Sequence, residues 1–326
     1  MRSVKKKAPS PGVSKSHFRR RTVSTGLHPI ESSPTTSNLP NSAAQRFEIH
    51  LEIAASDIGT TAPALLAQAA NLSMQKTKEA MSKGAAWLSR GRHTRRLRRH
   101  KARLQAGDRL HLYFDPTVLA QAAPEPTLIA DEHAYSVWYK PYGLHAQGSK
   151  WGDHTTLARW VELHLQPERP AFIVHRLDRA ASGLMLLAHG KATARQLAAL
   201  FQNREIGKRY QVIVHGVFPD KPEELTINSP LDAKPAVSHV RRLDTAPDQA
   251  LSLLEVRIET GRKHQIRRHL AGNGYPVLGD RLYGIEGDQE DLALAAVSLS
   301  FCCPITGARR RYELSAASRP RLTAVT

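Results

Sequence analysis

Two hydrophobic patterns in the second half of the chain restrict its fold more than any other feature. Residues 183–188 read GLMLLA, an uninterrupted apolar run typical of a buried strand. Residues 253–259 read LLEVRIE and alternate apolar with charged side chains, as a half-buried strand does. A helical pattern at 190–204 lies between the first strand and another alternating one at 208–216. Strands joined by both helices and hairpin-length turns predict an α+β fold with a mixed, mainly antiparallel sheet, and not a doubly wound parallel one.

Composition divides the 326 residues into four regions. Residues 1–45 are rich in Ser, Thr, Pro and basic residues, which predicts a disordered basic tail. Residues 46–118 have the pattern of a small α/β module. Residues 119–132 contain two prolines and read as a linker. The remaining residues, 133–326, are expected to form one larger domain.

The charge of the chain predicts a polyanionic partner. Lys and Arg number 47 against 29 Asp and Glu, a net charge of +18, and RNA or DNA is the commonest explanation. Between residues 76 and 109 there are 12 basic residues and only two acids, so we expect phosphate contacts there. The arginines expected to make them are Arg95, Arg96, Arg98 and Arg99. No apolar run reaches 18 residues, and we expect no membrane partner.

The small module shows two helices followed by strands. The first helix is expected over "APALLAQAANL", and the second is expected to start at Ser73 as N-cap and to end before Gly84. A short strand, a basic loop and a closing strand ending in "AGDRLHLYF" complete it. This order resembles the ribosomal S-four-like RNA-binding module, although the loop "RGRHTRRLRRHKAR" is longer than the tight turn usual there.

Several kinds of chemistry lack their sequence signals. The chain has no Gly-rich phosphate loop, no dinucleotide-binding glycine pattern and no zinc-ligand spacing. We therefore predict no metal and no cofactor. The only cysteines, Cys302 and Cys303, are adjacent and read as packed thiols. Two neighbouring thiols form no disulfide framework, which favours a reducing, cytoplasmic setting.

Three stretches carry the candidate chemistry: "HRLDRAASG" at 175–183, "GKRYQVIVHG" at 207–216 and "TGRKHQIRRHL" at 260–270. Asp178 is expected on a loop at the sheet edge, Tyr210 at the start of a strand and Arg267 on a short helix. An arginine beside a partly buried carboxylate keeps it charged and able to act as a nucleophile, and a tyrosine ring can stack on a base. A single carboxylate argues against ordinary glycoside hydrolysis. This set suits a reaction on a nucleoside.

These stretches also resemble a known family. "HRLDRAASG", "KRYQV" and "GRKHQIRRHL…YPVLGDRLYG" are similar, in the same order, to three signature motifs of the RluA-type pseudouridine synthases (RluA/RsuA family). "WYKPYGLHAQG" at 138–148 resembles the family's opening strand and turn. The likeness covers roughly residues 133–314. Ala181 stands where Thr is commoner, and Tyr142 where a small residue is usual.

The resemblance implies a sheet split by a central basic cleft and a role for each motif residue. Asp178 would be the catalytic nucleophile, Tyr210 would stack on the target base, and Arg267 would pair with Asp178. Arg176 would fill the gap left by the flipped uridine. Further RNA contacts are expected from Arg179, Arg262 and Lys263. Whether Asp178 attacks the sugar, adds to the base or removes a sugar proton stays open. We read His175, His264 and His269 as structural.

The implied reaction is the isomerisation of uridine to pseudouridine in structured RNA. Large-subunit ribosomal RNA is the expected substrate, and transfer RNA is the alternative. A catalytically silent RNA-binding assembly factor with the same fold is the rival interpretation, and a hydrolytic nucleoside glycosidase is a weaker one. Nothing in the sequence indicates self-pairing, so we expect a monomer.

Overall fold

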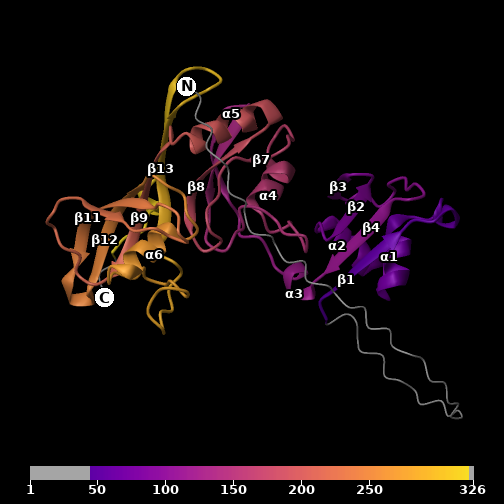
Figure 1. Cartoon of the computed structure of the whole chain (residues 1–326), viewed down its shortest axis with the longest axis horizontal. Coiled ribbons are helices and arrows are strands. Elements are labelled where there is room, and N and C mark those ends of the chain that lie inside the picture. The colour runs from indigo at the N-terminus through magenta and orange to yellow at the C-terminus, as the bar shows by residue number, and fades with distance from the viewer. Residues whose placement is uncertain (1–44, 323–326) are drawn as a thin grey trace, which may run out of the picture. The chain divides into compact units, whose positions relative to one another are not determined.

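The structure is a computed structural model that describes residues 45–322 (Figure 1). All but the last residue of the predicted basic tail, 1–45, therefore lies outside the described residues. No helix in the described part is long and apolar enough to cross a membrane.

The N-terminal part of the described chain forms a four-stranded antiparallel sheet with strand order β1-β4-β2-β3. Two helices pack their apolar side chains, including Leu66 and Met81, against Leu88, Leu110 and Leu112 of the sheet. Ser73 caps the second helix, since its hydroxyl accepts the Lys76 N–H at 3.2 Å, as predicted. The elements are β1 (Phe47–Glu52), α1 (Ala62–Ala70), α2 (Met74–Ser82), β2 (Ala86–Arg90), β3 (His93–Arg96) and β4 (Arg109–Phe114).

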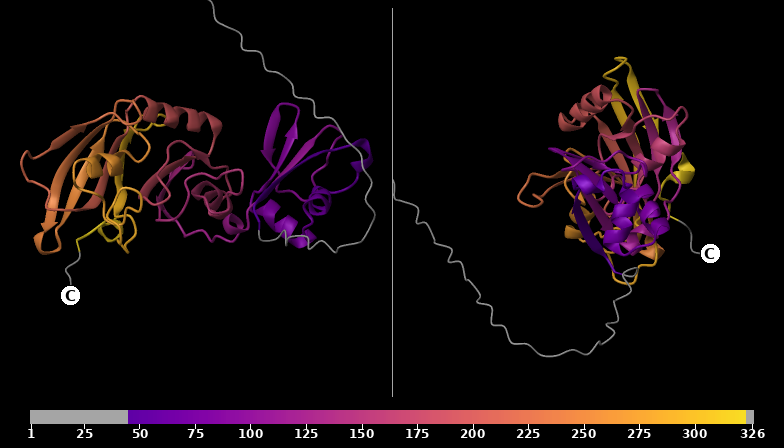
Figure 2. Two further views of the ribbon diagram at one scale, coloured as in Figure 1. Left: turned by 60° about the horizontal axis from the view of Figure 1, so that its bottom comes forward. Right: turned by 90° about the vertical axis from the view of Figure 1, so that its right-hand side faces the viewer.

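A larger sheet with strand order β10-β11-β12-β9-β13-β8-β6-β5 forms the rest of the fold, with β14 paired to β13 and β7 to β8. Its strand pairs are antiparallel except for β13 with β8, so the predicted mixed, mainly antiparallel sheet is confirmed. Its strands are β5 (Thr127–Asp131), β6 (Tyr135–Lys140), β7 (Phe172–Ile173), β8 (Ser182–Ala188), β9 (Gly207–His215), β10 (Leu225–Asn228), β11 (Val237–Ala246), β12 (Leu251–Ile258), β13 (Leu294–Cys302) and β14 (Arg309–Glu313). The β13–β14 hairpin, drawn in yellow, extends beyond its neighbours (Figure 2).

Both faces of β8 are covered, which explains its uninterrupted apolar sequence. Met185 and Leu187 belong to one hydrophobic cluster, whereas Leu184 and Leu186 belong to another on the opposite face. The helices α4 and α6 contribute to the first cluster and α5 to the second. The helical elements of this part are α3 (Pro116–Leu119), α4 (Leu157–His164), α5 (Lys191–Gln202), α6 (Gln265–Gly272) and the short 3-10 turns Pro247–Gln249 and Ala316–Ser318.

Three local expectations are corrected. The basic loop of the small module contains strand β3, which pairs with β2 because Gly91, at φ 56°, permits a tight turn. Part of the predicted linker, 119–132, forms β5 and belongs to the large sheet, because its backbone pairs with β6. Cys302 is exposed at the end of β13, and only Cys303 is packed.

The register around β13 brings two predicted motifs together. Ala296 pairs with Gly183 of β8 on one side and with Tyr210 of β9 on the other. Gly183 has φ +119°, and a Cβ there would lie 2.3 Å from the Ala296 nitrogen. Only glycine allows this close approach of the two backbones. The end of "HRLDRAASG" is thereby fixed beside Tyr210.

Candidate active site

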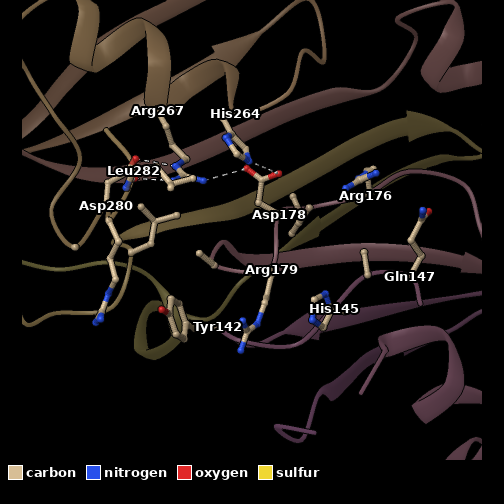
Figure 3. A pocket seen from close by; sticks show the side chains of 16 residues that line it. Tyr142, His145, Gln147, Arg176, Asp178, Arg179, His264, Arg267, Asp280 and Leu282 are labelled. Carbon is tan, nitrogen blue, oxygen red and sulfur yellow. Dashed lines mark hydrogen bonds and ion pairs between the residues drawn. The ribbon is translucent and has the colours of Figure 1, made fainter. Parts of the chain in front are cut away.

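Asp178 lies on the loop between β7 and β8, as predicted (Figure 3). Its carbonyl accepts the Ala181 N–H at 3.2 Å, which forms a tight turn before β8. The carbonyl of the next residue, Arg179, accepts the Gly143 N–H at 2.9 Å. The Asp178 side chain keeps 26% of its surface exposed. The carboxylate is therefore held on a fixed backbone and remains accessible.

His175 anchors the same loop. Its Nε2 accepts the Leu186 N–H at 2.9 Å, and its ring stacks on Phe201 with 4.3 Å between ring centroids. Burial, aided by the charge of Lys208, lowers the pKa of His175 to about 3. A neutral ring is what the acceptor role of Nε2 requires. The structural role predicted for His175 agrees with these contacts.

Tyr210 lies in β9, between β12 and β13, with its side chain half-buried. Burial raises the pKa of its hydroxyl, and the nearby negative charge of Asp178 raises it further. The phenol is therefore neutral over the physiological range.

Arg267 projects from α6 and is almost fully buried, with 5% of its side chain exposed. Its Nε and Nη2 donate to the two carboxylate oxygens of Asp280 at 2.7 and 2.6 Å. Asp280 also accepts the backbone N–H groups of Leu282 and Tyr283. Burial opposes the charge on Arg267, but the hydrogen bonds and charge of Asp280 outweigh it and raise the pKa of Arg267. The remaining nitrogen of Arg267, Nη1, lies 3.7 Å from Asp178 Oδ2.

The turn before α6 places His264 beside the same carboxylate. Its Nε2 lies 3.8 Å from Asp178 Oδ1, and its Nδ1 is 3.0 Å from the Tyr283 hydroxyl. Burial lowers the pKa of His264 in spite of the charge of Asp178. The residue has φ 55°, and the Gln265 side chain steadies the turn, since its Oε1 accepts from Thr260 and Arg262. His264 thus lies in the site, beyond the purely structural role predicted for it. His269, by contrast, is buried and hydrogen-bonded to Ser238 and Ser229.

Two adjoining cavities meet at Asp178. The smaller, of about 380 Å³, includes Tyr142, His145, Gln147 and Asp280 in its lining (Figure 3). The larger, of about 770 Å³, is lined by all three predicted catalytic residues, Asp178, Tyr210 and Arg267. Residues far apart in the sequence therefore surround one space large enough for a nucleotide-sized ligand.

Lys140 stabilises the backbone around Asp178. It is fully buried in β6, and its Nζ donates to the carbonyls of Pro141, Leu144 and Arg179 at 2.9, 2.9 and 3.2 Å. Burial lowers its pKa to about 7 although the charge of Asp178 acts in the opposite direction. These bonds tie the "KPYG" turn to the backbone that carries Asp178.

The predicted RNA-binding residues of the large domain surround the cavities. Arg176 is exposed and lines both of them, and Lys263 and Arg262 line the larger one. Arg262 also donates from Nε to the Pro235 carbonyl at 3.0 Å. Arg179 lines the smaller cavity, with its Nε 3.2 Å from the Gly143 carbonyl.

The four predicted arginines of the small module differ from one another. Arg96 and Arg98 both pair with Asp153, and both are largely covered. Arg96 also donates to the Ser149 carbonyl at 2.6 Å. Arg95 and Arg99 are exposed. The contact of all four with phosphate stays a prediction, but Arg96 and Arg98, already held by a carboxylate, have fewer donors to offer than Arg95 and Arg99.

Sequence reasoning missed Asp280 and Lys140 as residues that organise the site. Both stand in motif segments, "YPVLGDRLYG" and "WYKPYGLHAQG", that drew attention for their family likeness alone. An acid directly after a glycine turn, in the same motif segment as Arg267, was the available signal for Asp280.

Comparison with known proteins agrees with the fold and identifies the family. Residues 134–272 match the family model described as RNA pseudouridylate synthase. An uncharacterized RNA pseudouridine synthase of Aquifex aeolicus is 30% identical over 67% of this chain and 79% of its own length. The chain therefore belongs to the RNA pseudouridine synthase family, whose members are isomerases that convert uridine to pseudouridine in RNA.

Other relatives differ in the substrate that their names give. A ribosomal large subunit pseudouridine synthase D of Zymomonas mobilis is 32% identical over 59% of this chain and 69% of its own length. A tRNA pseudouridine synthase C of Pectobacterium carotovorum is 31% identical over 51% of this chain and 50% of its own. The chain spans only 43% of the length of an uncharacterized relative from Chloroflexus aurantiacus, but 81% of one from Bacillus subtilis.

Among solved structures, human RNA pseudouridylate synthase domain containing 1 has a similar fold. It is 19% identical, with a TM-score of 0.51 over 60% of this chain and 85% of its own.

The Asp280 contacts generate a prediction with a matched control. Asp280→Asn leaves the buried Arg267 without a full counter-charge, so we expect a loss of about 3 kcal/mol in the free energy of unfolding. We also expect kcat to fall on the order of a hundredfold, because Arg267 Nη1 loses its position. Asp232 likewise pairs with an α6 arginine, Arg268, but is 68% exposed. Asp232→Asn should leave the free energy of unfolding nearly unchanged, because exposed ion pairs contribute little. Equal losses from the two variants, measured by urea unfolding, would contradict this account.

His175 generates a prediction on pH. Its folded pKa, about 3, lies below the ordinary value of 6.5, so the unfolded chain takes up the proton first on acidification. Stability is therefore lost progressively as the pH falls below about 6.5. His175→Gln cannot titrate, and between pH 7.5 and 5 it should lose on the order of 1–2 kcal/mol less than the wild type. Urea unfolding at both pH values tests this, and parallel losses in the two proteins would show that His175 is not the titrating group.

Proposed function

We propose that this chain converts uridine to pseudouridine in a structured RNA and that Asp178 is the nucleophile. The observation that carries the proposal is the convergence of Asp178, Tyr210 and Arg267 on one cavity in a chain of this family. In the reaction the C1′–N1 glycosidic bond breaks, the uracil turns, and a C1′–C5 bond forms. The proton lost from C5 ends on N1, so substrate and product have the same composition.

Each side chain has a role that its surroundings support. The Asp178 carboxylate is partly exposed and faces the positive charge of Arg267 at 3.7 Å without a tight hydrogen bond. It therefore stays available to attack the sugar or the base. Tyr210 offers a neutral ring for stacking against the uracil, which compensates part of the unstacking of the flipped base. Arg267, held by Asp280, stabilises negative charge at the carboxylate.

The positive charge that lines the larger cavity favours an RNA substrate over a neutral small molecule. Six Lys or Arg side chains line the larger cavity against two acids: Arg176, Arg204, Lys208, Arg262, Lys263 and Arg267 face Asp178 and Glu259. A phosphodiester backbone is the partner that such a lining favours. We propose that Arg176 enters the space vacated by the flipped uridine, since it is exposed at the edge shared by both cavities.

For the RNA class we favour large-subunit ribosomal RNA and keep transfer RNA as the alternative. The small module supports the first choice, because we propose that residues 46–118 form an S-four-like RNA-binding module. The match to a ribosomal large subunit synthase over 69% of that protein's length adds to it. We further propose a cytoplasmic monomer, in keeping with two cysteines that are free thiols.

The isomerase and the silent assembly factor give opposite results with Asp178→Asn. We expect the variant to form no pseudouridine while binding RNA as the wild type does, because the lost charge acts in the reaction. RNA from cells lacking the protein is incubated with either protein, and pseudouridine is located by a chemical tag that stops reverse transcription. Asp232→Asn serves as the active control. Full activity in Asp178→Asn would refute the nucleophile, and no product from the wild type with RNA binding intact would favour the assembly factor.

The module arginines allow a paired test of RNA binding. Arg95→Gln/Arg99→Gln removes two exposed charges and should reduce the slope of log affinity against log salt by about 1.4, near 0.7 for each phosphate contact. Its melting temperature should not change. Arg96→Gln/Arg98→Gln should instead lower the melting temperature, because Asp153 loses both partners. Filter binding and thermal unfolding of both double variants distinguish the two effects, and identical salt slopes in the exposed double variant and the wild type would contradict the contact.

A further inference from the structure

Lys208 and Tyr210 share one face of β9, because residues two apart in a strand point to the same side. Both line the larger cavity together with Asp178. The Lys208 side chain is half-buried, and its Nζ lies 5.9 Å from the centre of the Phe201 ring. A second cationic group thus lies beside the residue expected to stack on the base.

Within the described chain, Lys208 has neither an ion pair nor a hydrogen bond to its ammonium group, in contrast to Arg267 with its two carboxylates. The cavity's other acid, Glu259, is 2.7 Å from His239 Nε2 and is not paired with Lys208. Burial lowers the pKa of Lys208, which shows that its surroundings disfavour the charged form. A half-buried cation without a counter-charge is costly, and a ligand anion removes that cost.

RNA offers one kind of anion, since its bases and sugars are neutral and its phosphodiesters are charged. A nucleotide that leaves its helix carries its own phosphodiester into the pocket. We propose that Lys208 binds a backbone phosphate at or next to the target uridine, while Tyr210, on the same strand face, stacks on the base. This inference rests on the proposed function for the identity of the flipped nucleotide, and it adds a phosphate subsite to the cavity.

A structural role for Lys208 is the competing explanation. Phe201 lies in the last turn of α5, where the partial negative charge of the helix end favours a cation. A lysine that serves only this purpose would stabilise the fold and leave the salt dependence of RNA binding unchanged. The two roles are therefore separated by measuring stability and binding on the same variants.

The test compares Lys208→Met, Lys208→Arg and, as a control, Lys191→Met, which removes an exposed lysine at the start of α5. The probe is a short transcript containing the uridine that the wild type modifies. If no uridine is modified, unmodified large-subunit ribosomal RNA replaces it. Affinity is measured by filter binding from low to high salt, and the melting temperature is recorded for each variant.

We expect Lys208→Met to weaken binding on the order of tenfold at low salt and to lower the salt slope by about 0.7. Lys208→Arg should keep the wild-type slope, as should Lys191→Met. An unchanged slope in Lys208→Met overturns the proposal, and so does a slope in Lys208→Arg that falls as far as in Lys208→Met.

A second measurement keeps the proposal testable if Lys208→Met does not fold. Single methylphosphonates, which are neutral, replace in turn each phosphate flanking the target uridine. One of them should lower the wild-type salt slope by about 0.7. The same substitution should lower the slope of Lys208→Arg equally, unless the arginine binds the phosphate less well than the lysine does. If no such substitution changes the wild-type slope, the phosphate subsite is refuted.

The subsite and the isomerase can fail separately where Lys208→Met folds. Absence of pseudouridine, together with a reduced salt slope in Lys208→Met, would refute the isomerase and leave the subsite standing.

Discussion

The buried ion pair between Arg267 and Asp280 is the interaction on which the site depends. Burying either charge alone would cost several kcal/mol, but the bidentate pair of hydrogen bonds from Arg267 and the backbone donors of Leu282 and Tyr283 give the carboxylate four donors. Asp280 takes two of the three guanidinium nitrogens and leaves Nη1 facing Asp178 at 3.7 Å. The structural demand on Arg267 is met by Asp280, so Asp178 is not locked into a tight pair and can take part in chemistry.

The strand register places the loop of Asp178 beside Tyr210. β13 pairs with β8 on one side and β9 on the other, and Ala296 lies opposite both Gly183 and Tyr210. The loop of Asp178 leads directly into β8, and Lys140 and His175 fix its backbone from two sides. The positions of Asp178 and of the Tyr210 ring are thus set by backbone pairing, which is more rigid than side-chain contact alone.

Periodicity in the sequence was enough to predict several of the elements and their type. The apolar run of β8, the alternation of β12 and the caps of α2 are local signals, and Asp178 was expected on a loop because it stands between two such elements. Asp280, the pairing of Arg96 and Arg98 with Asp153, and strand β5 were not predicted. The two sets of ion pairs join residues that lie well apart in the sequence, and neither spacing nor composition encodes which carboxylate a given arginine will meet. Strand β5 instead pairs with the next strand along the chain, β6. The family likeness supplied the pairing of Arg267 with Asp178, but not the residue that holds Arg267 in place.

Cations with a carboxylate partner and cations without one contribute differently to the net charge of +18 that a ligand meets. Cations such as Arg267, Arg96 and Arg98 already have carboxylate partners, so their contribution to an external field is largely cancelled at short range. Lys208 and Arg176 line the cavity without an ion pair in the described chain, and with Arg204, Arg262 and Lys263 they are the charges left for a ligand. On β9 the alternation of side chains places such a cation two residues from the ring of Tyr210. One strand face can then hold both the charged backbone and the neutral base of a single nucleotide, which positions the base relative to Asp178 before any bond is broken.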